Sequence, residues 1–246
     1  MKELRKGADQ VRRELDEQIN AWQRPVADLA DAVRQLIGRN EQQGGQATLT
    51  EKSIVSLVPR VEQLISSEIG AIGAGFIAAP SVVEGRRRYM LWLQERDGVP
   101  RHLRLNFDTE DLDAYDYERM DWYTAPRNSR TARLTGPFLD YSGSDHLVVT
   151  LTVPACSGGD FLGVAGIDLS AHAVEDVLVD HLRVLDDAAV VFNEERLVIA
   201  ANSTRWMPGE RIANFGTATP NPDPQLTVPL VEWSGWTIGI RQTVDA

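Results

Sequence analysis

The spacing of apolar residues near the N-terminus predicts long helices. Apolar residues recur every three or four positions and charged residues fill the positions between them; the apolar set is Leu4, Ala8, Val11, Leu15, Ile19, Trp22, Val26, Leu29, Val33 and Leu36. This spacing is typical of a narrow seam along a helix, and Pro25 predicts a kink or a new helix start. The seam leaves two interpretations open: a dimerisation surface, or a helix packed on its own domain.

After a glycine-bearing linker at residues 39–46, the pattern changes from helical to extended. Thr48 and Glu51 have the spacing of a capping box, and a helix with a broad apolar face follows them. Alternating or β-branched runs then predict strands at residues 75–79, 89–96, 101–107, 146–154, 161–169, 188–192, 196–201 and 236–241. A helix is expected from Ser170 to about Leu182, and the polar residues 108–135 are expected to form a long loop.

This order of elements predicts the fold class and the division of the chain. Helices followed by an antiparallel meander are typical of an α+β fold with its helices on one face of a sheet. We expect three parts: a helical arm at residues 1–46 that is a candidate for dimerisation, a main domain at residues 47–182, and a smaller α+β unit at residues 183–246.

Composition narrows the range of partners and locations. The formal net charge of -11 argues against direct binding of nucleic acid, which needs clustered Lys and Arg. Cys156 is the only cysteine, so the chain forms neither an intramolecular disulfide nor a thiolate metal cluster. The most apolar stretch, residues 69–83, is too short and too rich in glycine to span a membrane. We therefore expect a soluble cytoplasmic protein, extracytoplasmic only if the chain is a piece of a longer one.

Aromatic and acidic residues in the middle of the chain are the strongest candidates for a binding site. They are Tyr117, Trp122, Tyr123, Phe138, Asp140 and Asp168. Aromatic faces and carboxylate oxygens both attract positive charge, so the set predicts a site for a small cationic molecule. A structural interpretation stays open for several of them. Asp140 would then stabilise a turn, Asp168 would cap a helix, and the Trp122-Tyr123 pair would anchor the loop in the core.

The sequence predicts no catalytic or metal site and no cofactor. The four histidines are scattered without the spacing of metal ligands. Asp145-His146 lies near Ser142 and Ser144, but these serines lack the strand-turn-helix setting of a nucleophile. Cys156 has no evident base nearby in the sequence. We expect the protein not to be an enzyme.

Several motifs in a fixed order resemble the Cache (PAS-like, PDC) sensor domains of bacterial chemoreceptors and kinases. They are Trp122-Tyr123-x-x-Pro126, Gly136-Pro-Phe-Leu-Asp140, the strand at residues 147–154 and Gly163-Val-Ala-Gly-Ile-Asp168. Residues 189–202 and 233–241 are similar to the second module of double-Cache proteins, here in a reduced form. The resemblance covers residues 50–241. It implies a PAS-like curved antiparallel sheet beside a long helix, with the ligand held between the sheet and the long loop.

Within the double-Cache group, one subgroup recognises amino acids and another recognises amines. By this resemblance, Trp122 and Tyr123 correspond to the aromatic pair of the family's amine-binding elements, and Asp140 and Asp168 correspond to its acids. Phe138 stands where the family often has Tyr. The amino-acid subgroup has an Arg two residues before the Trp, where this chain has Met120. Arg119 comes one residue earlier and would point to the opposite face of an extended segment. The resemblance therefore favours an amine without a carboxylate.

The sequence as a whole predicts a soluble sensor domain. We expect it to recognise a small amine-containing or amino-acid-like metabolite and to signal through the helical arm of a homodimer to an unidentified partner protein. The alternative is a structural or interaction protein that keeps a Cache-like fold and no longer binds a ligand.

Overall fold

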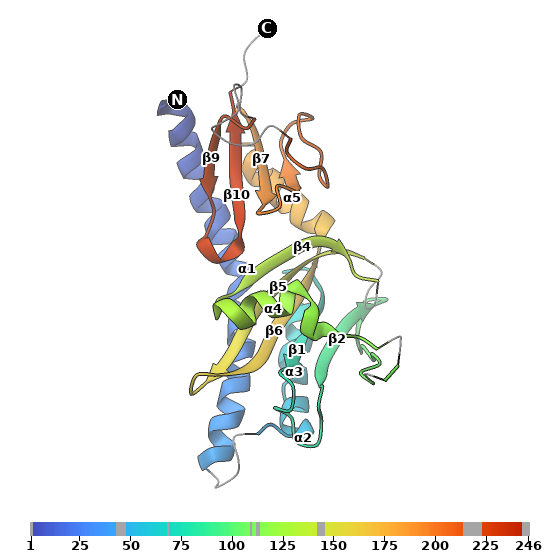
Figure 1. Ribbon diagram of the computed structural model, residues 1–246. Helices are drawn as coiled ribbons and strands as arrows, with labels where there is room; N and C mark the ends of the chain where they lie inside the picture. Colours follow the sequence, from blue (N-terminus) through green and yellow to red (C-terminus); the bar gives the residue numbers. More distant parts are fainter. Residues whose placement is uncertain are drawn as a thin grey trace. The chain divides into compact units, whose positions relative to one another are not determined.

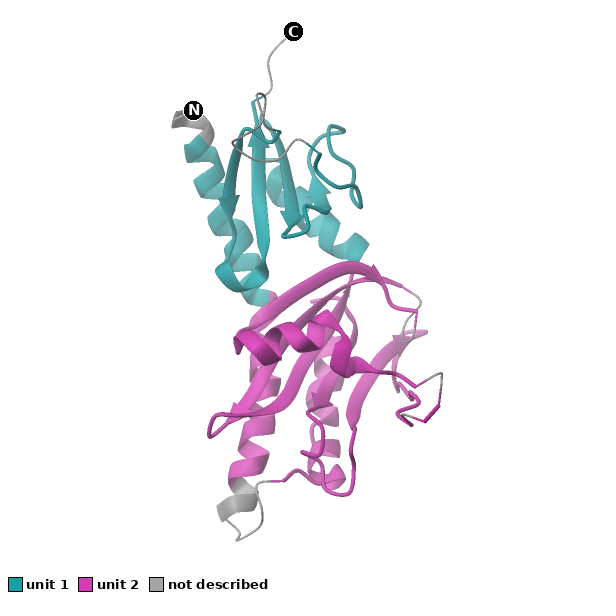
Figure 2. Ribbon diagram, viewed as in Figure 1, with its two compact units in different colours: residues 1–21, 171–246 teal, residues 22–170 magenta. Residues whose placement is uncertain are grey.

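The computed structural model describes residues 2–42, 48–67, 69–108, 110–111, 114–141, 146–213 and 223–242. It forms two compact units, unit 1 with residues 1–21 and 171–246, and unit 2 with residues 22–170 (Figure 2). The division into parts at residues 1–46, 47–182 and 183–246 stays a prediction, because compactness does not establish which segments act together.

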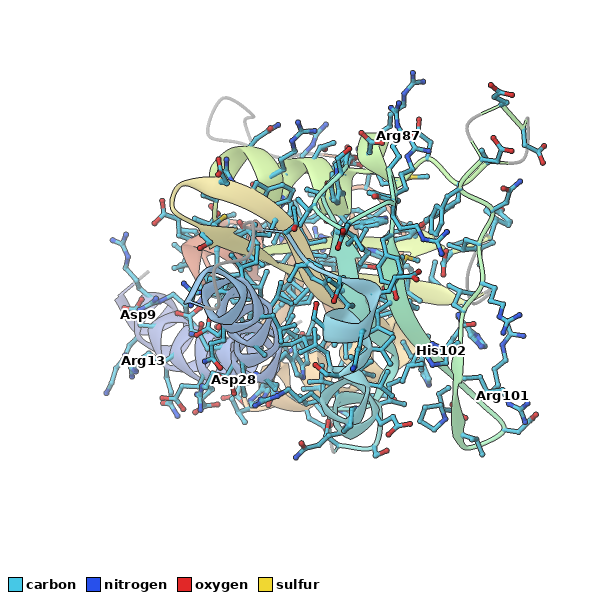
Figure 3. The ribbon with its side chains drawn as sticks, turned by 90° about the horizontal axis from the view of Figure 1, so that it is seen from below. Asp9, Arg13, Asp28, Arg87, Arg101 and His102 are labelled. Carbon is cyan, nitrogen blue, oxygen red and sulfur yellow. The ribbon has the colours of Figure 1, made fainter. Side chains whose placement is uncertain are left out.

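The N-terminal apolar seam lies on one continuous helix, α1 (Lys2–Gln42), which runs through Pro25 without a new start. Most of the seam is buried within the single chain, including Val11, Leu15 and Ile19 in unit 1 and Val26, Leu29 and Val33 in unit 2, whereas Leu36 is half-buried. The opposite face is polar, and Arg13 and Asp28 point into solvent (Figure 3). Of the two interpretations of the seam, the structure shows packing on the chain itself.

Unit 2 is built on a six-stranded antiparallel sheet in the order β3-β2-β1-β6-β5-β4. The strands are β1 (Ala71–Ala78), β2 (Met90–Arg96), β3 (Val99–His102), β4 (Arg133–Leu139), β5 (Leu147–Ser157) and β6 (Asp160–Ser170). Asp97 and Gly98 join β2 to β3 with positive φ angles of 55° and 75°, the backbone that a two-residue hairpin requires. The sheet, the long helix and a second α+β unit confirm the predicted fold class.

Two short helices precede the sheet, α2 (Glu51–Val55) and α3 (Val58–Ile65). The predicted capping box at Thr48 is wrong by two residues. Thr50 is the N-cap of α2, because its hydroxyl accepts from the backbone N–H of Ser53 at 3.1 Å while the Ser53 hydroxyl accepts from the N–H of Thr50 at 3.0 Å. Figure 1 shows α3 behind the sheet of unit 2, where it contacts β1 and β2.

The prediction of a long structureless loop at residues 108–135 is wrong. This segment contains a 3-10 turn, η1 (Tyr117–Arg119), and the helix α4 (Asp121–Ser129), and it ends in β4. The sequence signal of α4 is weak because Pro126 lies inside it and most of its residues are polar. It packs against β4, β5 and β6 in front of the sheet (Figure 1), so tertiary contacts rather than intrinsic propensity hold the helix.

Unit 1 has a four-stranded antiparallel sheet in the order β8-β7-β10-β9. Its further elements are α5 (Ala171–Leu182), β7 (Ala188–Asn193), β8 (Val198–Ala201), β9 (Leu226–Pro229), η2 (Glu232–Ser234) and β10 (Trp236–Arg241). The three strands expected here are present, and β9 is an addition that the sequence pattern did not indicate. Asp16 of α1 accepts from the backbone N–H of Val231 at 2.6 Å, which ties the helix to this unit.

Candidate ligand-binding site

A cavity in unit 2 lies between the sheet and the segment that leads into α4. It is lined by Ile77, Met90, Trp92, Leu103, Leu105, Tyr115, Trp122, Phe138, Asp140, Thr150 and Asp168. The space between the lining side chains, with its open mouth included, is about 400 Å³. Its wall therefore comes from both the regular strands and the segment that the sequence placed in a loop.

The pairing of strands explains why polar and aromatic residues meet at its floor. Trp92 of β2 lies opposite Gly75 of β1, while Asp168 of β6 lies opposite both Gly73 of β1 and Thr150 of β5. These two cross-strand rows are two residues apart along β1, so their side chains project from the same face of the sheet. Glycine at position 73 leaves room above the sheet for both the indole and the carboxyl group.

Asp168 is a buried acid whose Oδ1 accepts a hydrogen bond of 2.6 Å from the Thr150 hydroxyl. Burial raises the pKa of Asp168 to about 7 although the Thr150 hydrogen bond lowers it, and the Asp140 carboxyl raises it further. Near neutral pH Asp168 is thus balanced between its neutral and charged forms. A cation placed beside it would favour the charged form.

Tyr115 is an aromatic residue of the cavity wall that interacts electrostatically with both acids, Asp140 and Asp168. Burial raises its pKa, and the carboxyl groups of Asp140 and Asp168 raise it further. Its phenol consequently keeps its proton, so the hydroxyl is available as a donor. Sequence reasoning missed Tyr115; its position two residues before Tyr117 was the signal that could have identified it.

Trp122 enters the cavity from the first turn of α4. Its backbone carbonyl accepts a hydrogen bond of 2.8 Å from the Thr152 hydroxyl of β5, which fixes the start of the helix on the sheet. Phe138 and Asp140 reach the cavity from the end of β4, and the backbone N–H of Asp140 still pairs with the carbonyl of His146 at 3.0 Å. Four of the six predicted residues therefore line one cavity: Trp122, Phe138, Asp140 and Asp168.

Tyr117 and Tyr123 lie in the aromatic core beside the cavity rather than in its wall. Their ring centroids are 5.1 Å apart in an edge-to-face arrangement, and both side chains are fully buried. The Tyr117 hydroxyl donates to the carbonyl of Ala78 at 2.8 Å, whereas the buried Tyr123 hydroxyl finds no partner among the described residues. These two residues occupy the position of core anchors, and a direct ligand contact for them stays a prediction.

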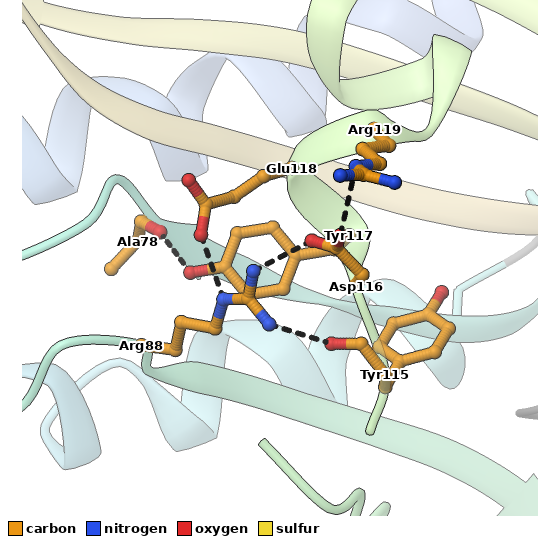
Figure 4. A network of polar contacts seen from close by, with 7 residues as sticks. All are labelled: Ala78, Arg88, Tyr115, Asp116, Tyr117, Glu118 and Arg119. Carbon is orange, nitrogen blue, oxygen red and sulfur yellow. Dashed lines mark hydrogen bonds and ion pairs between the residues drawn. The ribbon is translucent and has the colours of Figure 1, made fainter. Parts of the chain in front are cut away.

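Arg88 holds the segment that carries these aromatic residues (Figure 4). Its guanidinium donates to Glu118 at 2.7 Å and to Asp116 at 2.6 Å, and it lies 5.6 Å from the centroid of the Tyr117 ring. A longer contact of 3.5 Å reaches the carbonyl of Tyr115. Because the Arg88 side chain is only 7% exposed, this network is an internal brace for η1 and Tyr115 rather than a surface ion pair.

No arginine of the η1 segment reaches the cavity. The Arg119 side chain is 87% exposed and pairs with Asp116 at 3.2 Å, and Met120 is 38% exposed at the N-cap of α4. The extended conformation assumed for this segment is wrong, since Arg119 ends a 3-10 turn. Neither side chain lines the cavity, and the absence of a carboxylate clamp stays a prediction.

Within the described ranges, no group of three His, Cys, Asp or Glu side chains is placed to hold a metal ion. Ser142, Ser144 and Asp145 of the weak Ser/His/Asp pattern lie outside the described residues. None of the helices in the part of the chain that is described is both long and apolar enough to cross a membrane.

Comparisons with known proteins agree with this architecture. Residues 57–176 match the family described as methyl-accepting chemotaxis protein-like, first PDC sensor domain. The methyl-accepting chemotaxis protein PctB of Pseudomonas aeruginosa is 38% identical over 71 residues, which make up 28% of this chain and 11% of that protein. The match thus spans about a tenth of the length of the curated relative.

Solved structures with the same fold cover nearly the whole chain. The ligand-binding domain of PctB from Pseudomonas aeruginosa PAO1 in complex with L-Gln has a TM-score of 0.63 at 17% identity, over 98% of this chain and 89% of that one. The PctC domain from the same organism in complex with GABA has a TM-score of 0.60 at 15% identity, over 96% of each chain. The extracellular domain of a proposed histidine kinase, soHK1S-Z6, has 0.61 at 15% identity, over 98% of this chain and 93% of that one. At these identities the likeness shows the fold alone.

These findings correct one prediction and support another. The predicted cytoplasmic location is contradicted, because homologous sensor domains are the extracellular parts of membrane receptors. That prediction followed from the short apolar stretch at residues 69–83, and the length of this stretch says nothing about the compartment. The prediction that the chain is not an enzyme is confirmed by its match to a family of sensor domains.

Proposed function

The chain carries an MCP-like PDC sensor domain of the double-Cache type, and we propose that it recognises a small amine-containing metabolite in the cavity of unit 2. One observation carries this proposal. The cavity has two carboxyl groups, Asp140 and Asp168, among aromatic walls, and its lining contains no Lys, Arg or His among the described residues. Both carboxyl groups and the faces of the rings attract a positively charged ligand.

The same lining disfavours a ligand carboxylate. An amino acid bound here would bring its carboxylate beside the side chains of Asp140 and Asp168, and the described lining has no Lys, Arg or His to face it. Arg119 is exposed and paired with Asp116, so it offers no compensation in this conformation. The relatives PctB and PctC were solved with L-Gln and GABA, which both have a carboxylate, so an amine preference would be a departure from them.

A series of four-carbon ligands tests the proposal directly. Butylamine has only the amine, butyrate only the carboxylate, and 4-aminobutyrate both. We expect butylamine to raise the melting temperature and butyrate to leave it unchanged, because only a ligand that binds the folded state stabilises it. Stabilisation by butyrate alone would reject the amine assignment. No stabilisation by any amine, amino acid or carboxylate would favour the alternative, an interaction protein that no longer binds a ligand.

Matched variants assign the effect to the cavity. Asp140→Asn and Asp168→Asn each remove one negative charge with little change in volume, and we expect both to abolish the butylamine shift. Asp176→Asn makes the same chemical change on α5 in unit 1, where the side chain is 67% exposed, and should keep the shift. Loss of the shift in the control as well would show that net charge rather than the cavity controls binding.

We further propose that the protein signals as a homodimer to a partner protein. The buried seam of α1 is not free for a second copy, so the pairing surface would include the polar face that carries Arg13 and Glu17. A dimer in sedimentation velocity that Arg13→Glu weakens without loss of helicity would support this surface. A monomer at all concentrations, or a dimer that the substitution leaves unchanged, would reject it.

A further inference from the structure

Trp92 lies over a row of glycines on the sheet. A Cβ added to Gly75 would lie 2.8 Å from Cε3 of the indole, one added to Gly73 would lie 2.8 Å from Nε1, and one added to Gly166 would lie 3.5 Å from Cη2. These three atoms belong to different edges of the ring system, so the indole is laid flat over backbone that has no side chains. Its opposite face is the one that the cavity can use.

The indole lies beside the buried acid. The same Cβ on Gly73 that would lie 2.8 Å from Nε1 would lie 3.3 Å from Oδ2 of Asp168. This oxygen is distinct from Oδ1, which accepts from the Thr150 hydroxyl. The floor of the cavity thus combines a flat aromatic surface with a carboxylate oxygen at its edge.

Three further rings complete the enclosure, those of Tyr115, Trp122 and Phe138. Of the eleven lining residues, eight are aliphatic, aromatic or Met, and the only polar ones are Asp140, Thr150 and Asp168. Such a wall offers rings and negative charge, and its hydrogen-bond acceptors are the oxygens of Asp140, Thr150, Asp168 and the Tyr115 hydroxyl.

We infer that the cavity selects a methylated ammonium group, with Trp92 as the residue that determines this specificity. The inference rests on the proposed amine-binding function and narrows its ligand class. Trp92 was not among the predicted site residues. The signal that could have identified it is a tryptophan inside the expected strand at residues 89–96.

Hydration and hydrogen bonding distinguish the methylated group from a primary ammonium. A primary ammonium has three N–H donors and loses strong hydration when it enters an apolar enclosure, so it needs an acceptor for each donor. The acceptors of this wall are the oxygens of four residues, whereas the rings of Trp92, Trp122 and Phe138 offer no acceptor to the remaining donors. A methylated ammonium donates few or no hydrogen bonds, spreads its charge over its methyl groups, and is bound by aromatic faces in cages of this composition.

Ethanolamine, N,N-dimethylethanolamine and choline test the inference by isothermal titration calorimetry. The three probes share one positive charge and one skeleton and differ in their number of methyl groups. We expect affinity to rise with methylation, with choline bound roughly tenfold or more tightly than ethanolamine. If ethanolamine binds the wild-type protein as tightly as choline, the inference is wrong while the amine-binding function stands. If none of the three binds, both fail.

Substitution of Trp92 isolates the role of its indole in ligand specificity. Trp92→Leu should reduce the ratio of choline to ethanolamine affinity to about one, because the acids that attract either cation remain. Phe138→Leu provides a second reading from the opposite wall if Trp92→Leu does not fold, and should lower the same ratio. Trp236→Phe changes a buried tryptophan of unit 1 and should keep the ratio. An unchanged ratio in folded Trp92→Leu, or in Phe138→Leu where Trp92→Leu is unfolded, would overturn the inference.

Discussion

Asp168→Asn should remove a pH dependence of stability that the buried acid creates. The pKa of Asp168 is raised from 3.8 to about 7, mainly by burial, so between these pH values the folded protein keeps a proton that the unfolded chain releases. Its stabilising contribution is complete below 3.8 and is lost as the pH rises to about 7. Each pH unit in this window costs about 1.4 kcal/mol, or roughly 3 kcal/mol between pH 5 and 7.

The measurement is the free energy of unfolding in urea at about pH 5, 6, 7 and 8 for the ligand-free wild type and Asp168→Asn. Asn has no acidic proton and can still accept from the Thr150 hydroxyl, so other titrating groups cancel in the difference between the two proteins. We expect the variant to gain about 3 kcal/mol relative to the wild type from pH 5 to 7 and nothing further above about pH 8.

A constant difference across that range would refute the reasoning, since it would mean that Asp168 titrates near the ordinary value of an exposed carboxyl. Asp28→Asn is the matched control, because this carboxyl group is exposed on α1 (Figure 3) and contributes no buried acid. Its stability should follow the wild-type profile at every pH. If the free energy of unfolding of the control also rose with pH relative to the wild type, the effect would come from the change in net charge.

Three further predictions concern the ring cluster, its brace and the coupling of protons to ligand. Tyr117→Phe leaves the Ala78 carbonyl without its donor and should lower the free energy of unfolding by about 1–3 kcal/mol, whereas Tyr123→Phe should be neutral or stabilising in the same urea titration. Arg88→Met should cost about 2–3 kcal/mol in that assay and weaken ligand binding in calorimetry, while a variant as stable as the wild type would reject the brace. Cation affinity measured by calorimetry on the wild type should rise as the pH is raised to about 7 and then level off, with a proton released on binding, and an affinity independent of pH would contradict this coupling.

The apolar period of α1 predicted the helix and its buried face, but it could not show what covers that face. A spacing of three and four is the same whether the seam meets a second copy or the remainder of the chain. Residues such as Leu15 and Val26 are 0% exposed in a single chain, which decides between the two. Which surface covers the seam is decided by segments that lie far from α1 in the sequence, and these segments leave no signal in the local spacing of α1.

The helix α4 was missed for a related reason. Its residues have low intrinsic preference for a helix, and Pro126 lies within it. The Thr152 hydroxyl of β5 nevertheless holds the carbonyl of Trp122, and the buried side chains of the helix pack on the sheet. The sheet therefore supplies the stability that the sequence of the helix lacks, and reading the segment by itself gives a loop.

Local conformation also explains which predicted site residues share the cavity. Phe138 and Asp140 are two positions apart on extended chain, so they face the same side, and both line the cavity. Trp122 and Tyr123 are adjacent on a helix, where neighbouring side chains diverge by about 100°. One of them can face the cavity while the other enters the core, and the structure places Trp122 in the wall and Tyr123 at 0% exposure among the rings. Residue spacing thus shows which side chains share a face, and so line the cavity, only when the local conformation, strand or helix, is known.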